Sequence, residues 1–126
     1  MTQPHLVFVV DDDPGVLEVT CRFLREAGFE CVEANTGAEL MALLDGGRIP
    51  DLLVLDVRLP DVPGPELALR VHTRYPRIPV LFISAWPATA NHPRELDVLR
   101  WEFVQKPFTG EGLTAAARDL IARQPT

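Results

Sequence analysis

Acidic residues follow apolar segments at two places in this sequence, and both places could support metal or phosphoryl chemistry. Asp56 closes the run 51–56, whose interior is wholly apolar, and residues 57–60 with a proline follow at once. A short apolar run bounded by polar residues and proline predicts a strand that is buried on both faces. A carboxylate at the carboxyl end of such a strand lies where open α/β sheets bind their ligands.

A second acidic group follows the apolar segment 5–10, where three aspartates stand in a row. If this segment and the strand before Asp56 lie side by side in a parallel sheet, Asp11, Asp12 and Asp56 converge at one edge. Three converging carboxylates repel one another strongly unless a divalent cation lies among them. An all-oxygen ligand set selects a hard ion such as Mg²⁺.

Two more polar residues stand at predicted strand ends. Ser84 closes the apolar segment 79–84, and Lys106 follows the segment 102–105. Either residue alone is typical of an ordinary protein surface. Together with the carboxylates, they supply what phosphoryl transfer requires: a nucleophile, and positive charge and hydrogen-bond donors around the phosphoryl oxygens.

Alternating strands and helices are needed to bring these residues together. The apolar pattern predicts strands over residues 5–10, 29–34, 51–56, 79–84 and 102–105. It predicts helices over residues 14–27, 37–45, 65–75 and 110–123, the first with Asp13 as its N-cap and Pro14 in its first turn. Pro87 and Pro93 bar a continuous helix after Ser84, so we expect a short fourth helix that begins near Pro93. The alternation predicts an α/β fold with a doubly wound parallel sheet and right-handed crossovers.

Composition excludes several classes of protein. The chain has 126 residues, the size of one domain, and a formal net charge of −6 with its twelve Lys and Arg residues scattered, so we expect no direct nucleic-acid binding. No segment has the length of a membrane span and the N-terminus lacks a signal-peptide pattern, so we expect a cytoplasmic protein without membrane contact. Cys21 and Cys31 are expected to be free thiols.

Four motifs, each at a predicted strand end, resemble those of the receiver domain of two-component response regulators. The motifs are Val9-Val10-Asp11-Asp12-Asp13-Pro14, Asp56-Val57-Arg58-Leu59-Pro60 with Gly64 beyond it, Ser84-Ala85, and Lys106-Pro107-Phe108. The resemblance covers essentially the full length of the chain. It implies a single receiver domain over residues 1–126, with a flavodoxin-like five-stranded parallel sheet in the order 2-1-3-4-5 and five helices, the fourth irregular or shortened.

The resemblance implies roles for the acidic residues. Asp56 would be the phosphoacceptor, taking a phosphoryl group from the phosphohistidine of a histidine kinase or histidine phosphotransfer protein. Asp12 would be the main direct ligand of Mg²⁺, for which Mn²⁺ could substitute, and Asp11 would bind the ion largely through water. The backbone carbonyl of Arg58 would complete the protein ligands. Such a domain phosphorylates itself from small donors and slowly hydrolyses its own acyl phosphate, but it is not a turnover enzyme.

The resemblance also implies a conformational switch. Ser84 and Lys106 would each contact a phosphoryl oxygen, and the Lys106–Pro107 peptide bond would be cis, which would fix the loop of the lysine. Phosphorylation would draw Ser84 and Lys106 inward, and Phe103 would move into the space so opened, unless it is an ordinary core residue. The result would be a population shift of the fourth helix, fifth strand and fifth helix.

The segment 86–101 departs from the family pattern. It contains no glycine, and Leu99 stands where a turn glycine is expected. Arg58 and Trp86 each lie two residues past a site residue and would flank the phosphoryl group. A bulky Trp86 and a long Arg58 would hinder the attacking water and prolong the aspartyl-phosphate lifetime, unless both are solvated loop residues.

Two other functions are left open by the sequence. One is a pseudo-receiver, a binding module that works without phosphorylation; the complete set of site residues argues against it, whereas the unusual segment 86–101 favours it. The other is an aspartate-nucleophile phosphohydrolase of the haloacid dehalogenase type, which requires a second Asp two residues past the nucleophile, where Arg58 stands. No effector domain stands after residue 126 in this sequence, so we expect any output to pass through contact with a downstream protein partner or a fused domain, in a stand-alone regulator or a longer protein.

Overall fold

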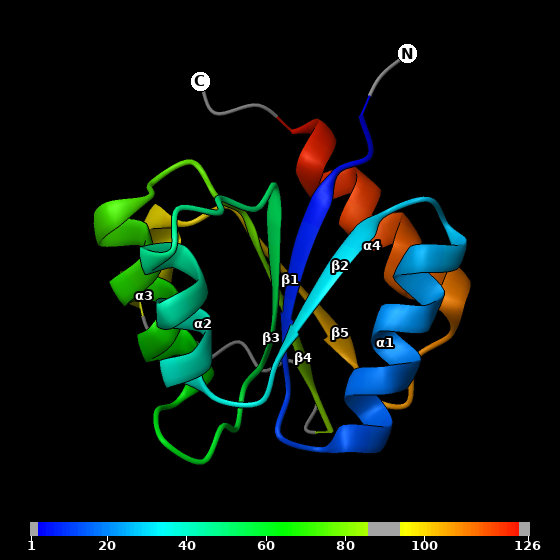
Figure 1. Cartoon of the computed structure of the whole chain (residues 1–126), viewed down its shortest axis with the longest axis horizontal. Helices are drawn as coiled ribbons and strands as arrows, with labels where there is room; N and C mark the ends of the chain where they lie inside the picture. Colours follow the sequence, from blue (N-terminus) through cyan, green and yellow to red (C-terminus); the bar gives the residue numbers. More distant parts are fainter. Residues whose placement is uncertain (1–2, 86–93, 124–126) are drawn as a thin grey trace.

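The computed structural model of the chain describes residues 3–85 and 94–123, which form a single parallel sheet between two layers of helices (Figure 1). The strands are β1 (Leu6–Val10), β2 (Glu30–Ala34), β3 (Leu52–Asp56), β4 (Val80–Ser84) and β5 (Trp101–Gln105). The helices are α1 (Pro14–Glu26), α2 (Gly37–Asp45), α3 (Gly64–Arg74) and α4 (Gly110–Ala122), with a 3-10 helix, η1, at Arg94–Val98. In Figure 1, α2 and α3 cover one face of the sheet, and α1 and α4 cover the other.

The strand order β2-β1-β3-β4-β5 confirms the predicted doubly wound topology. The strands differ from their predicted bounds by one residue at most, because apolar runs mark them clearly. The expected short fourth helix is a single 3-10 turn from Arg94, so the described residues contain four α-helices rather than five. The predicted start of that helix near Pro93, and Trp86 and Pro87 with it, lie outside the described residues.

The core has one layer on each face of the sheet, because successive side chains of a strand point to opposite faces. On β1, Phe8 and Val10 pack with the α2 and α3 side, whereas Val7 and Val9 pack with the α1 and α4 side. Every residue of the central strand β3 is buried. The carboxylate of Asp56 is therefore presented by a strand that cannot move without disturbing both layers.

The start of α1 is fixed by local hydrogen bonds that also shape the turn after β1. The Asp13 carboxylate accepts hydrogen bonds from the backbone N–H groups of Gly15 and Val16, which confirms it as the predicted N-cap, with Pro14 in the first turn. The Asp11 amide donates to the carbonyl of Ala34 on β2. These contacts hold the acidic turn against the end of the sheet.

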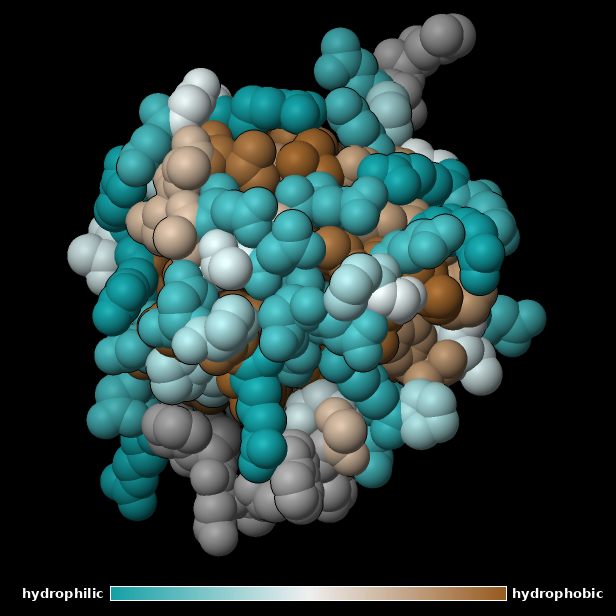
Figure 2. Space-filling view, turned by 60° about the horizontal axis from the view of Figure 1, so that its bottom comes forward, coloured by the Kyte–Doolittle hydropathy of each residue, from teal (hydrophilic) through white to brown (hydrophobic). Residues whose placement is uncertain are grey.

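The parallel register brings the carboxyl ends of the strands to one edge, at the lower end of Figure 1. Asp56 pairs with Ile83, and Ser84 pairs with Gln105, so β3, β4 and β5 end close together. Figure 2 turns this edge forward and shows mainly hydrophilic side chains, with hydrophobic ones visible between them. At the opposite, amino edge, β1 begins and α4 ends.

Candidate functional site

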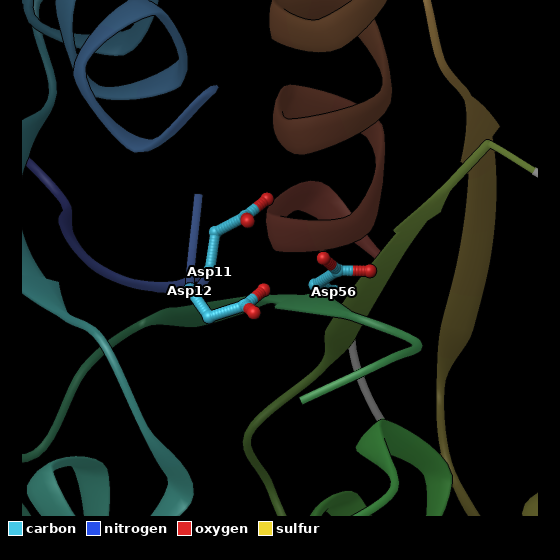
Figure 3. Close-up of side chains that lie close together, drawn as sticks. All are labelled: Asp11, Asp12 and Asp56. Atoms are coloured by element: carbon cyan, nitrogen blue, oxygen red, sulfur yellow. The ribbon is translucent and has the colours of Figure 1, made fainter. Parts of the chain in front are cut away.

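Three carboxylates converge at the carboxyl edge of the sheet (Figure 3). Asp11 and Asp12 follow β1, and Asp56 closes β3; one oxygen from each lies within 4.8 Å of the others. Asp11 is fully buried and Asp56 is 7% exposed, whereas Asp12 is exposed to solvent. The structure thus brings together the three acidic residues that the sequence placed at strand ends.

Lys106, which follows β5, reaches across the sheet edge to two of these carboxylates. Its Nζ lies 3.1 Å from Asp11 Oδ2 and 3.3 Å from Asp56 Oδ2, and its side chain is 18% exposed. The backbone N–H of Lys106 donates to the carbonyl of Ser84 at 2.7 Å, and the Lys106–Pro107 peptide bond is cis, as expected. One ammonium group therefore pairs with two of the three carboxylates.

Burial and charge act in opposite directions on these groups. Burial raises the pKa of Asp11, and the nearby Asp56 charge raises it further, although the Asp13 backbone N–H and Lys106 act against both. Burial alone would lower the pKa of Lys106, but the charges of Asp11 and Asp56 outweigh it and the net pKa is raised. Lys106 therefore stays protonated, while the acidic group retains an excess of negative charge.

Backbone contacts fix the Asp56 carboxylate and the turn that follows it. The Arg58 N–H donates to Asp56 Oδ1 at 3.1 Å, and the Gly64 N–H donates to the carbonyl of Val57 at 2.9 Å. A Cβ added at Gly64 would lie 2.3 Å from the backbone oxygen of Asp56, so this close approach requires glycine. The sequence contained Gly64 as part of a motif, but the contact that explains it is visible only in three dimensions.

Of the other predicted residues, Ser84 lies at this edge, whereas Phe103 lies in the middle of β5 and Leu99 precedes the start of that strand. Ser84 is 3% exposed at the end of β4, beside the strand of Asp56. Phe103, on β5, is half-buried and packs against the core on the α2 and α3 side. A turn glycine was expected at position 99. The leucine there is instead a buried core residue, and its N–H donates to the carbonyl of Leu96.

A largely apolar groove of about 580 Å³ opens beside Lys106, between the start of α1 and the turn before α4. The groove is lined by Val16, Val19, Ala85, Lys106, Pro107 and Phe108, with Asp13 and Gly15 at its side. The groove therefore places apolar surface next to Lys106. The sequence did not indicate it, because its lining comes from three separate segments.

Comparison with known proteins settles the family. The sequence profile described as the response regulator receiver domain matches residues 7–118. The chain belongs to the response regulator receiver domain family. It is 34% identical over 121 residues to the probable transcriptional regulatory protein TcrX of Mycobacterium tuberculosis, covering 96% of this chain and 51% of TcrX. It is 31% identical over 123 residues to the transcriptional regulatory protein CreB of Escherichia coli, covering 96% of this chain and 52% of CreB.

Solved structures agree with this assignment. A putative response regulator from Chloroflexus aurantiacus has a TM-score of 0.85 and 29% identity, covering 95% of this chain and 99% of that one. Membership of the receiver family displaces the haloacid dehalogenase alternative. The acidic site is thus the acidic site of a receiver domain in a two-component system.

The receiver chain spans about half the length of the curated relatives it matches. Those relatives are named as transcriptional regulatory proteins, so the predicted lack of nucleic-acid contact is not supported for a longer protein of this kind. Among residues 3–85 and 94–123, every helix is too short or too polar to cross a bilayer.

Proposed function

We propose that this receiver domain is a Mg²⁺-dependent phosphoacceptor switch, in which Asp56 takes a phosphoryl group from a phosphohistidine. The donor would be a histidine kinase or a histidine phosphotransfer protein. The observation that carries the proposal is the convergence of three carboxylates and Lys106 at one sheet edge. A nucleophile, a cation site and a fixed positive charge are then available to one phosphoryl group.

The acidic residues fit a hard divalent cation. Their ligand atoms are all oxygens within 4.8 Å of one another, and Lys106 alone does not balance their charge. Asp11, Asp12, Asp56 and the backbone carbonyl of Arg58 would hold Mg²⁺, or Mn²⁺ as a substitute. When bound, the ion would neutralise charge on the phosphoryl oxygens during transfer.

The transfer itself needs few steps from the protein. An Asp56 carboxylate oxygen attacks the phosphorus, and a P–O bond forms as the P–N bond to the donor imidazole breaks. The bonding electrons remain on the imidazole nitrogen, which takes up a proton. Lys106, already 3.3 Å from Asp56 Oδ2, stabilises charge on a phosphoryl oxygen, and the Arg58 N–H keeps the carboxylate oriented.

The groove beside Lys106 supports the protein donor. Its apolar lining, including Val16 and Phe108, adjoins Lys106, whose Nζ lies 3.3 Å from Asp56 Oδ2. Charge and apolar surface are therefore adjacent, as a specific but transient partner interface requires. A small donor such as acetyl phosphate would need the acidic residues and Lys106 alone.

Phosphorylation would change the contacts of this edge. Lys106 would exchange its carboxylate partners for a phosphoryl oxygen, Ser84 would contact another, and Phe103 would move with them. We expect the shift to reach η1, β5 and α4, and autodephosphorylation to reverse it. Arg58 and Trp86 would slow that reversal; unchanged acyl-phosphate decay in Arg58→Ala and Trp86→Ala would exclude this role.

The test is incubation with Mg²⁺ and acetyl phosphate, followed by intact mass and Trp fluorescence. We expect one phosphoryl group on the wild type and on Asp119→Asn, an exposed carboxylate control on α4, and none on Asp56→Asn. Beryllofluoride should give a related fluorescence change. The absence of an adduct with every donor would overturn the proposal in favour of a pseudo-receiver.

A further inference from the structure

The N-terminus of α2 is capped by two residues from different parts of the chain. Thr36 acts locally: its Oγ1 accepts from the Glu39 N–H at 3.1 Å. Asp61, distant in sequence, accepts hydrogen bonds from two more N–H groups of the first turn: Gly37 N–H donates to Oδ1 at 3.0 Å and Ala38 N–H to Oδ2 at 2.9 Å. Both oxygens of one carboxylate therefore bind donors that the helix itself leaves unsatisfied.

Asp61 lies in the loop that leads from Asp56 to α3. The loop begins where the Val57 N–H donates to Ile83 on β4, and it ends where the Gly64 N–H returns to the carbonyl of Val57. Asp61 ties the outer part of this closed loop to α2. The phosphoacceptor loop is thus attached to the helix layer through a carboxylate that does not belong to the acidic site.

The contact between the loop and α2 is also close at the level of van der Waals packing. Val62, next to Asp61, is 6% exposed and packs in the core on this face. A Cβ added at Gly37 would lie 2.6 Å from Val62 Cγ1 and 3.4 Å from both Asp61 carboxylate oxygens. The loop therefore has little room to shift toward α2.

Electrostatics favour the ionised form of this anchor. The N–H groups of Gly37 and Ala38 lower the pKa of Asp61, and the positive end of the α2 dipole favours a carboxylate there. The interaction is therefore present at neutral pH and weakens only in acid.

We propose that Asp61 is a positioning residue for the phosphorylation site, acting through Arg58. Arg58 lies in the same loop: its N–H orients Asp56 Oδ1 at 3.1 Å, and its carbonyl is a ligand of Mg²⁺ under the proposed function, on which this inference rests. Releasing the loop from α2 lets Arg58 move, so the cation loses a fixed ligand and Asp56 loses its orientation. Residues that orient metal ligands commonly change affinity by about 10–100-fold when they are removed.

The experiment compares two ways of weakening the same helix end. Asp61→Asn and Asp61→Ala remove the anchor, whereas Thr36→Ala removes the local cap and leaves the loop attached. Gly37→Ala disturbs the loop from the helix side with Asp61 intact. For each variant, circular dichroism checks folding, calorimetry measures Mg²⁺ binding, and acetyl phosphate labelling gives the Mg²⁺ concentration for half-maximal rate.

We expect Mg²⁺ affinity to fall about tenfold in Asp61→Ala and by a smaller factor in Asp61→Asn. Gly37→Ala should lower the affinity to a similar extent as Asp61→Ala. Thr36→Ala should lose helix stability but bind Mg²⁺ as the wild type does. If the Asp61 variants and Thr36→Ala all bind Mg²⁺ like the wild type, Asp61 is a helix cap only and the inference is wrong. If Asp61→Ala does not fold, Asp61→Asn and Gly37→Ala decide the question.

The two proposals fail in different ways. A wild type that binds Mg²⁺ but forms no phosphoryl adduct would overturn the proposed function, and calorimetry would still report the effect of Asp61. A wild type that is phosphorylated with an unchanged Mg²⁺ requirement in the Asp61 variants would overturn the positioning role alone.

Discussion

Replacing Gly64 with alanine tests whether the close return of the loop to Asp56 is what keeps this proposed phosphoacceptor in place. The added Cβ would lie 2.3 Å from the Asp56 carbonyl oxygen, 3.0 Å from Val57 Cα and 3.1 Å from the Asp56 carbonyl carbon. All three atoms belong to the backbone, so no side chain can rotate away. The Asp56 carbonyl and the start of α3 must separate by about 1 Å.

The expected cost follows from two opposing effects. Overpacking of a rigid site costs about 1–3 kcal/mol, and contact with backbone atoms places Gly64→Ala near the upper end. Alanine also restricts the unfolded chain, which returns about 0.4–1 kcal/mol. The net loss is about 2 kcal/mol, which for a domain of this size lowers Tm by about 8 °C. A shift of about 1 Å at the nucleophile would slow phosphorylation by about a hundredfold.

Thermal unfolding and acetyl phosphate labelling of Gly64→Ala measure both effects. Gly112→Ala is the matched control. Gly112 lies in the first turn of α4, and its added Cβ would meet a side-chain atom, Thr109 Oγ1, at 3.1 Å rather than backbone. Alanine is favoured in a helix, so this control should melt at or above the wild-type temperature and keep the wild-type rate. A Gly64→Ala protein that melts and labels like the wild type would refute the reasoning, since the loop could then yield without cost.

Three further predictions concern buried polar groups. Because burial raises the pKa of Asp11, the folded state binds its proton more tightly than the unfolded state does. Without Mg²⁺ this proton stabilises the fold at low pH, and the contribution is lost as pH rises above the ordinary value of 3.8 through the raised pKa. Urea unfolding across pH should therefore show this loss of unfolding free energy in the wild type and not in Asp11→Asn. Equal pH profiles of the two proteins would contradict the prediction. In the absence of Mg²⁺, Lys106→Met should lower the unfolding free energy by about 1–3 kcal/mol, because it leaves buried carboxylate oxygens without their donor. Adding Mg²⁺ should restore part of the loss, and denaturant titration with and without Mg²⁺ measures both effects. Cys21 and Cys31 are buried free thiols, so a thiol reagent should label neither in the native protein and both in guanidinium; rapid native labelling would contradict their burial.

The sequence predicted the sheet and the acidic residues because both depend on short-range patterns. An apolar run such as 51–56 marks a buried strand, and in a parallel sheet the strand ends meet whatever the details of the helices. The strand-end positions of Asp11, Asp56 and Lys106 therefore predict that their side chains meet at one edge of the sheet.

Other features depend on contacts between distant segments. Asp61 resembles any loop aspartate in sequence, because its partner helix lies more than twenty residues away and offers only backbone N–H groups. Leu99 was read as a departure from a glycine turn, but the replacement of the fourth helix by a single 3-10 turn buries it instead. Such adjustments follow from packing, which no local pattern encodes.

The acidic residues and the two ends of the described chain lie at opposite edges of the sheet. The acidic residues occupy the carboxyl edge, whereas β1 begins and α4 ends at the amino edge, where Arg123 pairs with Glu102 near the start of β5. A tether, reporter or neighbouring domain attached at either end of the described chain would therefore stand away from Asp56. The molecule could be immobilised on a sensor surface through either end of the described chain, with the carboxyl edge, where we propose phosphorylation, still open to a donor.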